Sequence, residues 1–146
     1  MNFLFGSSPR RTALALTFLR IATGVVFVVH GYQKLFVMGF GGVTGAFGHM
    51  GAPFPSLTGP LFGICEFTFG LAVIVGLFTR IGALWFVLDM LGAIAVVHIR
   101  NGWSGPMGLE FPTLLLFAAL AVLLAGPGFF ALDNFLAARF ILRSGK

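Results

Sequence analysis

Four stretches of this chain are long and apolar enough to cross a lipid bilayer. A spanning helix needs about 20 mostly apolar residues, because roughly 30 Å of hydrocarbon is crossed at about 1.5 Å per residue. The stretches cover about residues 13–36, 57–78, 81–99 and 111–126. Each helix satisfies its own backbone hydrogen bonds, so no sheet is needed in lipid. The sequence predicts an all-α membrane protein, a four-transmembrane-helix bundle in a single domain over residues 1–146.

The composition excludes two other classes of protein. Hydrophobic residues make up 58% of the chain and charged residues 9%, whereas a soluble domain carries about 25% charged residues. The net charge of +5 does not indicate nucleic-acid binding, because the basic residues lie at the ends of apolar runs instead of on a polar surface. A single cysteine, Cys65, excludes an intrachain disulfide framework.

Lys and Arg near the helix ends predict the orientation. On one side, which holds both termini, the basic residues are Arg10, Arg11, Arg20, Arg80, Arg139, Arg143 and Lys146. The other side carries Lys34 and Arg100. Because cytoplasmic segments are enriched in Lys and Arg, we expect a multi-pass protein with both termini in the cytoplasm.

Two connecting segments carry further helical signals. The glycine-rich connection over residues 37–56 predicts a short interfacial helix around residues 43–50, in the first extracytoplasmic loop. In residues 129–146, Phe135, Leu136 and Arg139 fall at helical spacing, as in a helix on a membrane surface. This segment is expected to be a cytoplasmic amphipathic tail, although an ordinary solvated tail has nearly the same sequence pattern.

Ionisable residues from all four stretches share the extracytoplasmic half of the predicted bundle. They are His30, Lys34, Glu66, His98 and Glu110. A charge at the bilayer centre costs at least about 2.5 kcal/mol, so such residues indicate a functional site. We predict His30, Lys34, Glu66 and His98 as catalytic residues. The predicted ligand contacts are Glu66, Gly63, Gly70 and Glu110, because the two glycines let a neighbouring helix or a flat ligand approach Glu66; no metal site is predicted.

Other interpretations of these residues remain open. Glu66 could form a purely structural ion pair with Lys34 or a histidine, and two histidines on different helices could ligate a b-type haem. Asp89 is the deepest acid, and nine residues separate it from His98, which turns the two toward nearly opposite faces. Arg20 or Arg100 could reach toward it. A transporter with an acidic site at Asp89 is the third functional hypothesis.

Several segments resemble the DoxX family of small membrane proteins. Residues 30–35, His-Gly-Tyr-Gln-Lys-Leu, resemble the signature that closes the family's first helix. Glu66 with Gly70 and residues 76–80 resemble its E-x3-G...GLxTR segment, and residues 90–98 its third helix. Residues 110–112 with 126–133 resemble its closing pattern, except that Ala131 stands where the family usually has Ser.

The resemblance implies a four-helix bundle in the bacterial cytoplasmic membrane with a link to quinone and sulfur redox chemistry. The leading hypothesis is a quinone-linked redox component, in which the predicted catalytic residues hydrogen-bond quinone oxygens and exchange protons. No flavin, nucleotide or metal motif is found, so the electron donor would be a partner oxidoreductase or a soluble molecule. The alternative is a non-catalytic membrane anchor or assembly subunit of a redox complex.

Overall fold

The computed structural model describes residues 6 and 8–144, with side chains up to residue 139, and this part of the chain is helical without strands. The elements are α2 (Pro9–Tyr32), η1 (Gln33–Met38), α3 (Gly39–His49), α4 (Pro55–Val75), α5 (Thr79–Ala93), η2 (Ile94–His98), α6 (Glu110–Ala125) and α7 (Leu132–Ser144). The two η elements are π-helical continuations of α2 and α5. The prediction of an all-helical protein is confirmed.

Three helical stretches are long and apolar enough to span a membrane. They are Pro9–His49, Pro55–Val75 and Thr79–His98. The fourth apolar helix, α6, has 16 residues. Each of the four predicted stretches therefore corresponds to an apolar helix, and the last of them is the shortest.

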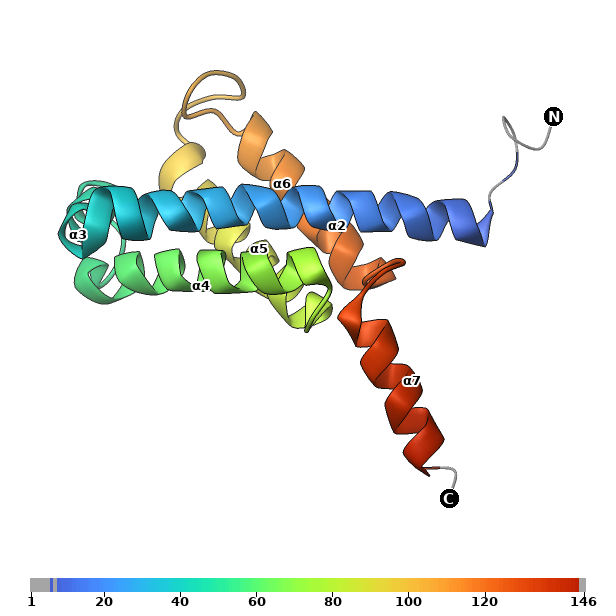
Figure 1. Cartoon of the computed structure of the whole chain (residues 1–146). Coiled ribbons are helices and arrows are strands. Elements are labelled where there is room, and N and C mark those ends of the chain that lie inside the picture. Colours follow the sequence, from blue (N-terminus) through green and yellow to red (C-terminus); the bar gives the residue numbers. More distant parts are fainter. Residues whose placement is uncertain (1–5, 7, 145–146) are drawn as a thin grey trace.

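Helices α2 and α4 lie side by side and antiparallel (Figure 1). Their contact depends on glycine, because a Cβ atom on Gly31 would lie 2.4 Å from the backbone nitrogen of Phe67. Nearer the start of α2, a Cβ on Gly70 would lie 2.8 Å from the backbone nitrogen of Val28. Small residues at such points allow two backbones to approach closely, which is how helices associate without a hydrophobic driving force.

The core lies where α2, α5 and α6 meet. The rings of Phe27 and Phe86 are stacked in parallel, with 3.7 Å between their centroids. Leu115 and Ala119 of α6 and Val73 of α4 are also buried there. Large apolar side chains are exposed on the outward faces of the four apolar helices, as expected where lipid is the solvent.

The chain enters and leaves the bundle at the same end. The backbone N–H of Phe129 donates to the hydroxyl oxygen of Thr17 at 2.8 Å, which joins the segment after α6 to the first turns of α2. From there α7 projects away from the bundle, and α3 lies at the opposite end (Figure 1). We call these two ends the α7 end and the α3 end.

Helix boundaries differ from the sequence-based ones, and two of the differences bear on the fold. The loop helix is longer than residues 43–50: α3 begins at Gly39, whose φ is 68°, and packs through the buried Val43 against Gly59 of α4. Helix α5 begins at Thr79 instead of residue 81, so Thr79 and Arg80 lie in its first turn instead of in a connection. The connection between α4 and α5 consists of residues 76–78.

Candidate functional site

An ion pair between α2 and α4 forms the centre of the site. The ammonium of Lys34, on η1, donates to the two carboxylate oxygens of Glu66 at 2.6 and 2.5 Å. Glu66 is 3% exposed and Lys34 is 22% exposed. The pair is therefore shielded on the carboxylate side and reaches the molecular surface through the lysine.

His30 lies one turn before Lys34 and faces the same pair. Its imidazole is half-buried and within electrostatic range of both Lys34 and Glu66. The ring also meets Phe111 of α6 edge-on, with 6.0 Å between centroids. The structure thus brings together three of the four predicted catalytic residues.

Asp89 joins this group from α5, although sequence analysis did not include it among the site residues. It is 4% exposed and interacts electrostatically with Glu66 and Lys34. Neither arginine proposed as its partner fills that role. Arg20 instead donates to the carbonyl of Phe130 at the α7 end, and Arg100 is exposed. We call His30, Lys34, Glu66 and Asp89 the polar cluster.

The aromatic side chain of Trp85, on α5, flanks Glu66. The ring of Trp85 lies 5.4 Å from that of Phe62 and 6.1 Å from that of Phe69, measured between centroids. Phe62 and Phe69 precede and follow Glu66 by one turn on the α5-facing side of α4, so the indole lies beside Glu66. Its Nε1 is buried without a hydrogen-bond partner among the described residues.

Two further predicted site residues, the catalytic candidate His98 and the ligand contact Glu110, bind the loop between η2 and α6. The Nδ1 of His98 lies 2.8 Å from the carbonyl oxygen of Met107. The carboxylate of Glu110 is exposed and accepts a hydrogen bond from the hydroxyl of Ser104 at 3.0 Å. Both side chains therefore have partners in residues 99–109, and the structure shows neither in contact with the Lys34–Glu66 pair.

Side chains of η1 and α2 occupy the space beside the two glycines that were predicted as ligand contacts. A Cβ on Gly63 would lie 3.1 Å from the Cβ of Lys34, and one on Gly70 would lie 2.7 Å from a methyl group of Val28. Of the two uses foreseen for them, approach of a helix or of a flat ligand, the structure shows the helix. They position Lys34 against Glu66.

Lys34 lies in a π-helical turn, which sequence analysis did not foresee. Residues 33–38 are π-helical, and such turns occur frequently at functional sites because they widen the helix and redirect side chains. Among the described residues, no three His, Cys, Asp or Glu side chains converge as a metal site would require. The side chains of the polar cluster can donate and accept hydrogen bonds and exchange protons.

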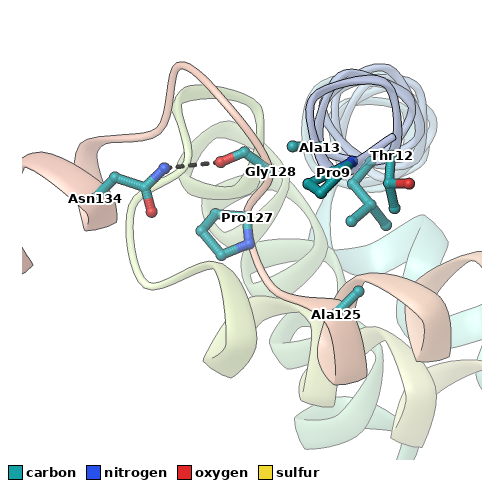
Figure 2. Close-up of a pocket in the computed structure, with 8 residues that line it drawn as sticks. Pro9, Thr12, Ala13, Ala125, Pro127, Gly128 and Asn134 are labelled. Atoms are coloured by element: carbon teal, nitrogen blue, oxygen red, sulfur yellow. Dashed lines mark hydrogen bonds between the residues drawn. The ribbon is translucent and has the colours of Figure 1, made fainter. Parts of the chain in front are cut away.

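Two hollows lie elsewhere on the molecule. One, of about 510 Å³, lies at the α7 end, where Pro9, Thr12 and Ala13 face the segment that follows α6 (Figure 2). Another, of about 660 Å³, lies beside the start of α7. Neither is lined by an acidic or basic side chain, so the polar cluster remains the candidate site.

Comparison with known proteins points to one family. The family model described as DoxX matches residues 15–99. "Putative oxidoreductase CatD" of Bacillus subtilis is 37% identical over 117 residues, which is 80% of this chain and 83% of that protein. "Inner membrane protein YphA" of Escherichia coli is 31% identical over 125 residues, 82% of this chain and 88% of that protein.

A third relative comes from another bacterial group. "Uncharacterized membrane protein Rv3486" of Mycobacterium tuberculosis is 30% identical over 132 residues, 83% of this chain and 80% of that protein. No solved structure matches.

Proposed function

This chain belongs to the DoxX family of membrane proteins, and from that premise we propose that it is a quinone-linked redox component of the bacterial cytoplasmic membrane. The name of the Bacillus subtilis relative describes an oxidoreductase, which supports redox chemistry here. The single observation that carries the proposal is the convergence of Lys34, Glu66 and His30 at one buried point.

The proposed topology has four membrane crossings with both termini in the cytoplasm. Helices α2 and α4 run antiparallel, and so do α4 and α5, because Gly82 near the start of α5 meets Val73 near the end of α4. The hydrogen bond between Phe129 and Thr17 places the segment after α6 beside α2, at the end where the chain enters the bundle. This arrangement supports an even number of crossings, and the Arg residues of the α7 end support its placement in the cytoplasm.

The polar cluster has the groups that a quinone headgroup would use. Lys34 is partly exposed and His30 half-buried, so both can donate hydrogen bonds to a carbonyl oxygen. The ring of Phe111 lies edge-on to the imidazole of His30, and Phe36, in the same π-helical turn as Lys34, contacts Tyr32 and Phe67 at 5.1 and 5.6 Å between centroids. Flat rings and hydrogen-bond donors together suit the flat cyclic diketone of a quinone headgroup that enters from lipid.

Quinone reduction takes two electrons and two protons. We propose that the polar cluster supplies protons to the oxygens and that a partner oxidoreductase or a soluble reductant supplies the electrons. This chain contributes hydrogen-bond donors, a buried carboxylate that balances the lysine charge, and shielding from water. Those are the parts of the reaction that side chains can provide without a bound redox group.

The ion pair between Lys34 and Glu66 also favours a second function. Lys34 engages the two oxygens of Glu66, and α2 covers Gly63 and Gly70, so the pair also holds α2 against α4. In that case the protein is a non-catalytic anchor that binds an oxidoreductase through its surface. Intramembrane polar groups serve this purpose in many helical bundles.

Trp85 provides a direct test of quinone binding. The chain has two tryptophans, and Trp103 is 63% exposed in the loop before α6, so Trp103→Phe leaves Trp85 beside Glu66 as the sole indole. Titrating this purified variant with a short-chain benzoquinone or naphthoquinone should quench its fluorescence saturably. Loss of a charge-assisted hydrogen bond in Glu66→Gln or His30→Gln should weaken binding about ten- to a hundredfold.

The matched control is His49→Gln at the exposed end of α3, which should bind as tightly as the parent. Quenching that rises linearly with quinone in every variant would mean collision within the detergent and would refute the quinone proposal. Stoichiometric co-purification with an oxidoreductase, without saturable quenching, would establish the anchor instead.

A further inference from the structure

The polar cluster has more acidic groups than cations close to them. Glu66 and Asp89 interact with each other, and Lys34 is the ammonium beside both. Arg20 lies at the α7 end with the carbonyl of Phe130, and Arg100 is exposed beyond η2. With both carboxyl groups ionised and His30 uncharged, the cluster would carry one negative charge that no permanent cation beside it balances.

Such a charge would be costly in this position. Asp89 and Glu66 are 4% and 3% exposed, within helices that lipid surrounds. An uncompensated buried charge costs several kcal/mol, and buried acids avoid that cost by remaining protonated. The Lys34–Glu66 pair is already neutral, so the extra proton belongs between Glu66 and Asp89.

We propose that Glu66 and Asp89 share one proton at neutral pH, so that Asp89 is a buried carboxylic acid and the polar cluster stores a proton. This assigns a role to a residue that neither the ion pair nor the family signature explains.

Hydrogen bonding supports the same assignment. The Oδ2 of Asp89 is buried without a hydrogen-bond partner among the described residues. Two ionised carboxylates only accept hydrogen bonds and cannot bond to each other, whereas one proton converts either of them into a donor. A shared proton therefore gives Asp89 a partner in Glu66.

The other ionisable groups around Asp89 do not change this charge balance. From α2 and η1 come His30 and Lys34, and from α4 comes the half-buried Cys65 beside Glu66. In the described part of α6 the ionisable residue is Glu110, which is exposed and bonded to Ser104. Among these side chains the one permanent cation is Lys34.

The use of the stored proton rests on the proposed function. When Lys34 gives a proton to an oxygen of a quinone that receives electrons from a partner oxidoreductase, a neutral amine remains. The proton of the carboxyl pair then passes from Asp89 to Glu66 and from Glu66 to Lys34, which restores the ion pair and leaves Asp89 ionised. Proton uptake from water returns Asp89 to its starting state. Asp89 thus reloads Lys34 without contacting the quinone.

Infrared spectroscopy tests the shared proton directly. The chain has four Asp and Glu residues, so the C=O band of a protonated carboxyl group can be assigned with few variants in an ester-free detergent. At neutral pH the wild-type protein should show this band, with a downshift in D2O, and Asp89→Asn should lose it. Glu110→Gln is the matched control and should retain it.

A second variant keeps the test decisive if Asp89→Asn misfolds. Lys34→Met removes the cation, so Glu66 should also take up a proton and the band should roughly double. A wild-type spectrum without the band, or a band that survives in Asp89→Asn, would overturn the proposal. The result is independent of Trp85 quenching: a band without quinone binding leaves the proton store and removes its proposed use, whereas binding without the band removes the store alone.

Discussion

Asp133 caps α5 by accepting a hydrogen bond from the backbone N–H of Thr79 at 2.8 Å, although 54 residues separate the two in sequence. Its other carboxylate oxygen accepts from the N–H of Phe78, also at 2.8 Å. The backbone N–H of Asp133 in turn donates to the carbonyl of Gly76. The first turn of α7 thereby satisfies donors at the start of α5 and fastens the connection between α4 and α5.

Removal of this cap should destabilise the protein. Asp133→Ala leaves the two backbone donors unsatisfied, and loss of a helix cap costs about 0.5–2 kcal/mol, so we expect a loss near the upper value. Thermal unfolding in detergent would measure the change. Asn134→Ala is the control, because the side chain of Asn134 donates to the carbonyl of Gly128, and its loss should have a smaller effect. Equal losses in the two variants would contradict the capping role.

Gly31→Ala should separate α2 from α4. The added Cβ would lie 2.4 Å from the backbone nitrogen of Phe67, which cannot rotate away as a side chain could. Overpacking of this kind costs about 1–3 kcal/mol. Gly92→Ala is the matched control in α5, where a Cβ meets nothing within 4 Å, so it should stabilise the helix by about 0.5–1 kcal/mol. Comparable stabilities of both variants, by thermal unfolding, would refute the close approach.

The two halves of the Lys34–Glu66 pair should differ in their cost of removal. Lys34→Met leaves Glu66, which is 3% exposed, without its cation, so that its carboxyl group must take up a proton, and breaking a buried pair in this way costs about 3 kcal/mol. Glu66→Gln leaves a lysine that is 22% exposed and can turn to water, so its cost should approach the roughly 1 kcal/mol of a surface pair. The double variant should recover part of the loss. Unfolding free energies that are additive would show that the pair contributes nothing.

The helices were predictable from apolar runs, whereas their ends depended on contacts between distant residues. The start of α5 was placed two residues late because its cap, Asp133, comes from another helix. The loop helix was placed at residues 43–50, but it begins four residues earlier, where the backbone turns at Gly39. Neither the cap by Asp133 nor the backbone turn at Gly39 is encoded in the local pattern of hydrophobic residues.

The candidate site was predictable in part. The depth of a residue follows from counting residues along its helix, and this count placed Lys34, Glu66 and His30 at one depth. In the structure the three residues lie close together. His98 and Glu110 have a similar predicted depth, yet the fold of residues 99–109 gives them other partners. Sequence analysis could not foresee that loop.

Asp89 had a signal that was overlooked. Glu66 and Asp89 lie about ten residues before and after the connection at residues 76–78. In two antiparallel helices joined by a short turn, residues at equal distances from the turn lie at the same level. That count would have paired the two acids and removed the need for an arginine partner.

The four-crossing topology depends most on α6, and accessible cysteines can test it. Its 16 residues extend about 24 Å, less than the roughly 30 Å of hydrocarbon. In a Cys65→Ala background, we expect Ser56→Cys and Asn101→Cys to react with an impermeant maleimide in intact cells. Arg139→Cys on α7 should react only after the membrane is opened.

Each alternative topology gives another labelling pattern with the same three cysteines. If α6 does not cross, Arg139→Cys will react from outside together with Asn101→Cys. If only one of α4 and α5 crosses, Ser56→Cys and Asn101→Cys will react from opposite sides. If all three patterns are reversed, four crossings stand and the orientation inferred from Lys and Arg is wrong. The expected pattern alone places Lys34 and Glu66 toward the extracytoplasmic surface, because these two residues lie nearer the α3 end than the α7 end.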